Sequence, residues 1–221
     1  MVSIGFRSEL APPAPKIVRL KKTQIGRAGV TLAHAFQNDP LMAYTLPAPS
    51  ERASLLPEFY IRMVRFGFLS GEVYTTEGAG AIEGAAVWLP PGVKWDRQRV
   101  EAAGLHELSE LIGDGAMGRF REVVGLEARA RERDMISPYW YLLLLGVAPN
   151  RQQQGLGGRL MEPILNRARR ENLVCYLETE QPSNVAYYLK HGFEVVVGGE
   201  MAGASGVRFW TFRRPGLKSP G

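Results

Sequence analysis

The chain has 221 residues, a length that suits one domain, or one domain with an insertion, around a hydrophobic core of ordinary size. Its net charge of +5 comes from arginines interleaved with glutamates, and no basic run is interleaved with aromatic residues, so an ordinary solvated surface is favoured over a nucleic-acid surface. The single cysteine, Cys175, excludes an intramolecular disulfide and favours a reducing, cytoplasmic compartment. The N-terminus lacks the apolar region of a signal peptide, and no apolar run approaches the roughly 20 residues of a membrane span.

The first half of the chain predicts a short tail followed by strands and helices. Residues 1–15 end in Ala-Pro-Pro-Ala-Pro, which indicates a disordered tail, and residues 16–214 are expected to form a single domain. Within that domain the patterns predict a strand over 16–20, a helix from Thr23 to about Phe36, a proline-bounded loop over 39–49, a helix from Ser50 to about Leu69 that Pro57 bends, and a hairpin of strands 72–76 and 81–89.

Residues 93–134 carry an amphipathic pattern that is interrupted near residues 113–118. The pattern predicts one or two helices, which we interpret as an insertion lying over a sheet.

The remaining chain alternates strands and helices. We expect strands over 139–147, 173–179, 193–197 and 207–213, and helices over 156–171 and 183–190. About 30 residues separate the starts of the first two of these strands, with a helix between them, which implies that they pair in parallel. The last two strands suggest an antiparallel hairpin across residues 198–206.

The loop between strand 139–147 and helix 156–171 places three glycines where the helix begins. The first amides of a helix have no intrahelical partner and carry the positive end of the helix dipole, so they attract anions. Glycines let a phosphate approach that backbone closely. The alternative is a glycine-rich turn that only packs helix on strand. The residues of this candidate phosphate cradle are Gln152, Gln153, Gln154, Gly155, Leu156, Gly157 and Gly158.

Two other phosphate-binding motifs are excluded. A dinucleotide fold would use Gly155 and Gly157 with Glu178 about 20 residues later, but its third glycine is missing and the loop from Val147 to Gly155 is too long for its tight turn. A Walker phosphate loop needs Gly-Lys-Ser/Thr, which the sequence does not contain.

The pattern Gln152-x-x-Gly155-x-Gly157, behind an apolar strand that ends in Leu-Gly-Val-Ala-Pro, resembles the acetyl-CoA-binding motif of the GNAT N-acetyltransferase superfamily. The segment from Asn184 through Tyr188 to Gly192-Phe193 resembles a second motif of that family. The resemblance implies an α/β fold with a mixed, mostly antiparallel sheet, a central parallel strand pair splayed around acetyl-CoA, and helices on both faces.

The resemblance also implies site residues. The pantetheine arm of acetyl-CoA would lie along Leu145, Gly146 and Val147, the pyrophosphate on the glycine loop, and an amide from Gln181 or Asn184 would help to hold the coenzyme. Tyr188 occupies the family's general-acid position, although a core aromatic is the alternative reading. Glu178 is the candidate general base, with Glu83 in reserve.

These observations predict an acetyl-CoA-dependent N-acetyltransferase that acts on a primary amine, expected to be that of a small molecule. A non-catalytic acetyl-CoA-binding regulatory module is the alternative, and a homodimer stays open. We expect no nucleic-acid partner, no membrane partner and no metal, since His34, His106 and His191 have no carboxylate or cysteine partners at ligand spacing.

Overall fold

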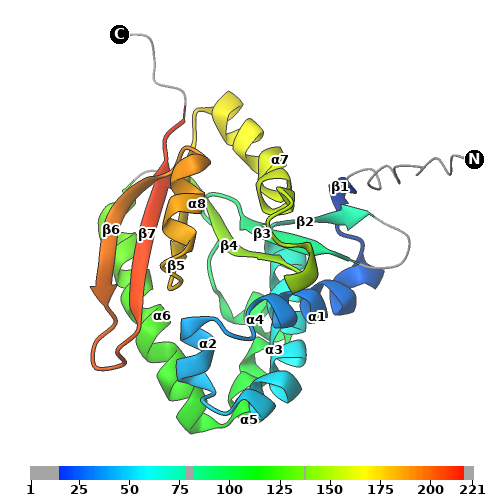
Figure 1. Cartoon of the computed structure of the whole chain (residues 1–221), viewed down its shortest axis with the longest axis vertical. Helices are drawn as coiled ribbons and strands as arrows, with labels where there is room; N and C mark the ends of the chain where they lie inside the picture. The colour runs from blue at the N-terminus through cyan, green and yellow to red at the C-terminus, as the bar shows by residue number, and fades with distance from the viewer. Residues whose placement is uncertain (1–14, 78–81, 137, 217–221) are drawn as a thin grey trace, which may run out of the picture.

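The computed structural model describes residues 15–77, 82–136 and 138–216. The described residues form a seven-stranded sheet in the order β1-β2-β3-β4-β5-β7-β6 (Figure 1). Every neighbouring pair is antiparallel except β4 and β5, which confirms the mostly antiparallel sheet with one parallel pair. The strands are β1 (Lys16–Arg19), β2 (Glu72–Glu77), β3 (Gly84–Leu89), β4 (Tyr139–Val147), β5 (Val174–Thr179), β6 (Glu194–Met201) and β7 (Arg208–Arg214).

Helices cover both faces of this sheet, as expected (Figure 1). On one face, α1 (Ile25–Ala35) and α3 (Pro49–Ser70) pack against each other and against β3. On the other face, α7 (Leu156–Glu171) and α8 (Asn184–Lys190) enclose a second apolar cluster with β4, β5 and β7. Both α3 and α7 continue through their internal prolines, Pro57 and Pro163.

The segment between β3 and β4 is helical, as its amphipathic pattern predicts, but it contains three helices where one or two were expected. They are α4 (Arg97–Ala103), α5 (Leu108–Ile112) and α6 (Asp114–Asp134). The break falls at Gly113, whose φ of 83° suits glycine, and α6 runs on through Gly118. α5 and α6 lie over the same face as α3, because their apolar side chains join the same cluster, and Ala103 of α4 packs in a smaller cluster with Phe66 of α3.

Several local expectations were wrong. The segment 39–49, expected as a loop, contains α2 (Pro40–Thr45), because the Asp39 carboxylate accepts hydrogen bonds from the amides of Leu41 and Met42 and proline suits a first helical position. Thr23 does not cap α1 but lies in a 3-10 turn over Lys22–Gln24, and α3 begins at Pro49 rather than after Ser50. The strand expected to end at 197 continues to Met201.

Other expectations fall outside what the structure describes. The tail expected over residues 1–15 lies outside the described residues apart from Pro15, as do residues 78–81 of the predicted hairpin. In the part of the chain that the structure describes, no helix is both long and apolar enough to cross a membrane.

Candidate active site

The parallel strands β4 and β5 part in the middle of the sheet. They pair at only three positions, the last being Tyr141 with Tyr176. Just beyond this point β4 carries an irregularity opposite Val87 and Trp88, where Leu143 is the extra residue of a bulge. A bulge bends its strand and increases the local twist. The stretch of β4 from Leu142 to Val147 therefore turns away from β5 and leaves one backbone edge free of a ladder partner.

The glycine loop lies at the end of that free edge. Gly155 adopts a left-handed conformation with φ of 76°, and α7 begins at the next residue. The first intrahelical donor is the Arg159 amide, which bonds the Gly155 carbonyl at 3.2 Å. The amides of Leu156, Gly157 and Gly158 precede that donor, so the helix itself does not use them. The Gln152 side chain holds the loop to the strand by donating to the Val147 carbonyl at 3.1 Å.

A groove of about 360 Å³ opens beside this helix start. It is lined by Leu145 and Val147 of β4, by residues of the loop, and by Ser183, Asn184, Tyr187 and Tyr188 of the neighbouring α8 segment. A second hollow of about 350 Å³ continues along the other side of the strand end and reaches Gln181. The free strand edge, the unused amides and the groove provide what a phosphorylated, extended ligand requires.

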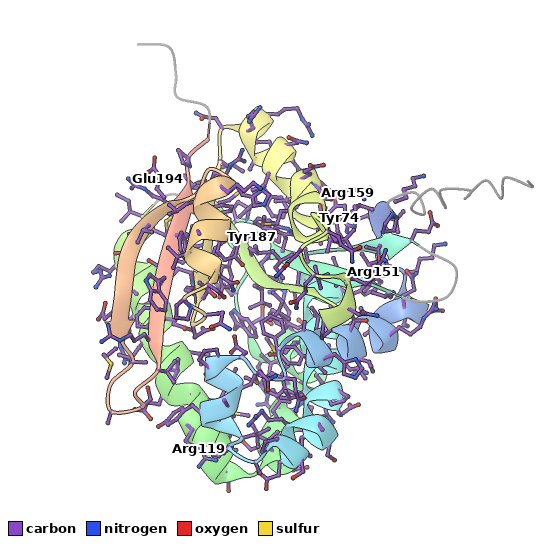
Figure 2. The ribbon with its side chains drawn as sticks, viewed as in Figure 1. Tyr74, Arg119, Arg151, Arg159, Tyr187 and Glu194 are labelled. Carbon is purple, nitrogen blue, oxygen red and sulfur yellow. The ribbon has the colours of Figure 1, made fainter. Side chains whose placement is uncertain are left out.

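Two of the three glycines also permit close helix packing. A Cβ on Gly157 would lie 2.5 Å from Tyr187 Oη, and a Cβ on Gly158 would lie 2.5 Å from His191 Cε1. Figure 2 shows Tyr187 reaching from α8 toward the start of α7. The two interpretations of the loop are therefore compatible: Gly157 lines the groove and makes room for Tyr187, whereas Gly158 faces His191.

A cavity of about 120 Å³ lies where β4 and β5 diverge, and acidic side chains line it. Leu142 to Leu145 supply one wall and Asn184 and Tyr188 another, so this central cavity adjoins the groove. The carboxylates come from four different positions in the chain: Asp39 before α2, Glu127 on α6, Glu178 on β5 and Glu180 just beyond β5.

Glu178, the predicted base, points into this central cavity. Its side chain is only 4% exposed, and its Oε1 accepts a hydrogen bond from Arg131 Nη1 at 2.6 Å. Burial raises the pKa of Glu178 to about 7, with Glu180 adding to the rise while Arg131 and Tyr141 oppose it. The Arg131 guanidinium lies 4.4 Å from the centre of the Tyr141 ring. A carboxyl with a pKa near neutrality can accept a proton at physiological pH and release it again.

Glu127, Asp39 and Glu180 are the acidic cavity residues that sequence reasoning missed as site residues. Glu127 is 6% exposed, and its Oε1 has no hydrogen-bond partner in the described residues. Burial, followed by the charge of Glu180, raises the pKa of Glu127 and of Asp39 well above the usual range. No motif marks Glu127. Asp39 stands out in the sequence only because it precedes Pro40 in a segment expected to be a loop.

Tyr188 lies at the junction of the groove and the central cavity and lines both. It is 6% exposed, and burial raises its pKa far above that of a free tyrosine, so the hydroxyl is protonated at neutral pH. Tyr187 is the neighbouring alternative donor. Its hydroxyl is buried without a described hydrogen-bond partner, and burial raises its pKa to about 12.

The remaining predicted site residues include Gly146, Asn184, Gln154 and Glu83. Gly146 is buried under α1, since a Cβ there would lie 2.6 Å from Leu32 Cδ2, and it lines the second hollow rather than the groove. Asn184 donates to Thr179 Oγ1 at 3.0 Å and so ties α8 to the end of β5, while Gln154 donates to the Asn150 carbonyl at 3.4 Å, within its own loop. Glu83, the reserve base, is paired with Arg151 at 3.1 Å on the flank of the glycine loop.

The remaining candidates for chemistry are the single cysteine and a metal-binding group. Cys175 is buried in β5, and burial raises its pKa to about 12, which fits an inert thiol. Among the described residues, no three His, Cys, Asp or Glu side chains are grouped so that they could hold a metal ion.

Comparison with known proteins agrees with this geometry. A family model described as an acetyltransferase (GNAT) domain matches residues 110–195. A protein of Schizosaccharomyces pombe, described as an uncharacterized N-acetyltransferase, is 30% identical over 184 residues, which cover 79% of this chain and 72% of that protein.

Solved structures show the same fold at low sequence identity. A Corynebacterium glutamicum protein, described as histone acetyltransferase HPA2 and related acetyltransferase, has a TM-score of 0.67 and 19% identity, covering 93% of this chain and 98% of that one. Arylalkylamine N-acetyltransferase 2 of Aedes aegypti has a TM-score of 0.62 and 12% identity, covering 90% and 98%. A Drosophila melanogaster polyamine N-acetyltransferase that forms N-acetylagmatine has a TM-score of 0.58 and 18% identity, covering 90% and 100%.

Proposed function

Because the chain belongs to the GNAT family of N-acetyltransferases, which use acetyl-CoA as cosubstrate, we propose that it transfers the acetyl group directly to the primary amine of a small molecule. The observation that carries this proposal is the position of the acidic central cavity, which adjoins the groove beside Leu145 and Tyr188. A protonated amine is a cation, and buried carboxylates attract it at the point where it must react.

The cosubstrate would use the backbone more than side chains. The free edge of β4 from Leu145 to Val147 would hydrogen-bond the pantetheine arm as an added strand does. The amides from Gln153 to Gly158 would receive the pyrophosphate, with Gln152 holding the loop in place, and Gln181 and Asn184 would border the arm. A backbone amide near the end of β4 would polarise the thioester carbonyl.

Proton transfers then follow from the side chains around the central cavity. Glu178 takes a proton from the amine, whose nitrogen forms the new bond to the acetyl carbon while the carbon–sulfur bond breaks. Tyr188 gives its hydroxyl proton to the departing thiolate and recovers a proton from the nitrogen of the new amide. Glu178 and Tyr188 lie on different walls of the cavity, so one can serve the amine while the other serves the sulfur.

A small acceptor suits the enclosure of the cavity. Helices α2, α3 and α6 supply side chains that wall it, including Met42, Tyr60 and Glu127. The fly and mosquito enzymes of the same fold are named for small amines, which agrees with such an acceptor, although their low identity carries only the fold.

The direct test is release of free coenzyme A from acetyl-CoA in the presence of a panel of small primary amines. We expect amine-dependent release and an acetylated amine detectable by mass spectrometry. Binding of acetyl-CoA without release by any amine would instead support a regulatory module.

The pair Tyr188→Phe and Tyr187→Phe locates the proton donor in the same assay. Tyr188→Phe should lower kcat on the order of a hundredfold, because a positioned acid is lost while the ring that packs against Phe193 and Phe212 remains. Tyr187→Phe is the matched control and should stay within about threefold of the unmodified protein. A large loss of kcat in Tyr187→Phe with near-normal kcat in Tyr188→Phe would identify Tyr187 as the proton donor instead.

A further inference from the structure

The helical insertion encloses an apolar chamber of about 360 Å³ next to the central cavity. Its walls come from the segment before α4, from α4 to α6, and from β4. The apolar side chains that define this chamber are Trp95, Val100, Leu105, Leu108, Met117 and Leu143. The volume falls in the range of roughly 300–1,000 Å³ typical of small-molecule sites, which are mostly apolar with a few placed polar groups.

The chamber and the central cavity are neighbours that share six lining side chains. Met63, Phe120, Val124, Glu127, Tyr141 and Leu143 line both. Glu127 stands at this junction with its buried Oε1 lacking a described hydrogen-bond partner. A buried oxygen without a donor is costly, and a bound ammonium group would donate to Oε1 and favour the ionised form of Glu127.

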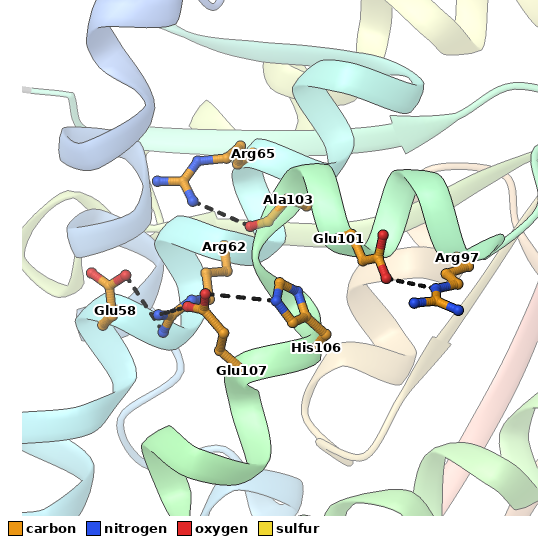
Figure 3. A network of polar contacts seen from close by, with 8 residues as sticks. All are labelled: Glu58, Arg62, Arg65, Arg97, Glu101, Ala103, His106 and Glu107. Atoms are coloured by element: carbon orange, nitrogen blue, oxygen red, sulfur yellow. Dashed lines mark hydrogen bonds and ion pairs between the residues drawn. The ribbon is translucent and has the colours of Figure 1, made fainter.

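The insertion is held to α3 by a polar network that keeps the chamber in shape (Figure 3). Arg62 of α3 pairs with Glu107 at 2.8 Å and with Glu58 at 3.5 Å, and Arg65 Nη1 donates to the Ala103 carbonyl at 3.2 Å. Trp95 stacks on Phe66 of α3 with ring centres 4.0 Å apart. The chamber is thus built before any acceptor arrives, which reduces the entropic cost of binding.

We propose that this chamber selects acceptors with an apolar body: an alkylamine or arylalkylamine whose ammonium group meets Glu127 and Glu178 and whose hydrocarbon part fills the chamber. This inference rests on the proposed function and specifies its substrate class. A second amino group on the acceptor would be buried among apolar side chains, and the charged groups bordering the chamber besides Glu127 are Arg121 and Arg131, which would repel it.

A chain-length series tests the selection. kcat/KM should rise by up to about fourfold for each methylene from ethylamine to hexylamine, the factor expected for burying one CH₂ group. Phenylethylamine should be a good acceptor, and 1,6-diaminohexane should be at least about tenfold poorer than hexylamine. A flat series, or a preference for the diamine, would overturn the chamber proposal while leaving amine acetylation intact. No acetylation of any amine would instead refute the proposed function.

Ala128→Phe fills the chamber from α6 without touching the central cavity. It should abolish the gain from ethylamine to hexylamine, so that the ratio of their kcat/KM values falls to about one. Ala102→Phe, on the exposed face of α4, is the matched control and should keep the full series. Should Ala128→Phe fail to fold, Val100→Phe narrows the chamber from α4. A folded chamber variant that keeps the full chain-length dependence would refute the assignment.

Discussion

At the scale of single residues, Glu178 is the predicted site residue whose chemistry depends most on the surrounding cavity. Its place on β5 could be predicted, because Glu178 falls within the strand expected over 173–179 and the family resemblance calls for a carboxylate there. Its environment could not, because Arg131 lies 47 positions earlier on α6 and Glu127 on the same helix. Asp39 and Glu180 likewise meet in the cavity only through the tertiary fold. Motifs identify residues within one strand–helix unit, whereas the acceptor side is assembled from distant segments.

The pKa of Glu178 near 7 predicts a pH dependence. If its carboxylate is the base, kcat/KM should rise as pH increases through about 7 and then level, because only the ionised form accepts the amine proton. Arg131 lowers this pKa, so Arg131→Met should move the rise to higher pH; Tyr141 would still oppose the upward shift and Glu180 would add to it. The measurement is kcat/KM for a fixed amine between about pH 5.5 and 9.

Two controls accompany that profile. Arg129→Met, on the exposed side of the same helix, should leave the rise where it is. Glu178→Gln should remove the rise together with most of the activity at neutral pH. If the pH profile of kcat/KM is unshifted in Arg131→Met and unchanged in Glu178→Gln, the general base is another group.

At the scale of elements, the continuous apolar run of β4 and the apolar stripe of α7 gave bounds that the structure confirms, 139–147 and 156–171. Those signals are strong because each element buries a regular set of side chains. The bulge at Leu143 carries no comparable signal, since Leu142 to Leu145 are identical in type. α2 was missed because its proline suggested a loop, although proline is also favoured in the first turn of a helix.

Gly157 offers a test of the helix start. Gly157→Leu should weaken acetyl-CoA binding by about tenfold or more, because its side chain would displace the Tyr187 hydroxyl and enter the groove. Gly118→Leu in α6, where a Cβ meets no atom within 4 Å, is the matched control and should leave affinity unchanged. Calorimetric titration with acetyl-CoA measures the affinity of both variants. Equal affinity in a folded Gly157→Leu protein would refute the phosphate cradle.

At the scale of the whole molecule, the charges are arranged unevenly. The chain carries a net charge of +5, yet its central cavity contains four acidic side chains with Arg131 beside them. Arg151, with a side chain 30% exposed, lines the groove at the glycine loop. Anionic acetyl-CoA thus meets a solvated groove that Arg151, paired with Glu83, borders, whereas the amine meets buried carboxyl groups.

This arrangement predicts different salt dependences for the two substrates. Salt screens exposed charges within a Debye length of about 10 Å at 0.1 M and affects buried pairs much less. KM for acetyl-CoA should therefore rise several-fold between about 50 and 500 mM NaCl, while KM for the amine changes by less than about twofold. Arg151→Gln should flatten the acetyl-CoA dependence, because it removes a solvent-accessible cation from the groove and leaves Glu83 unpaired there, and Arg97→Gln, on exposed α4, should not. A stronger salt dependence for the amine than for acetyl-CoA would mean that the acceptor is recognised by the surface rather than by the buried carboxylates.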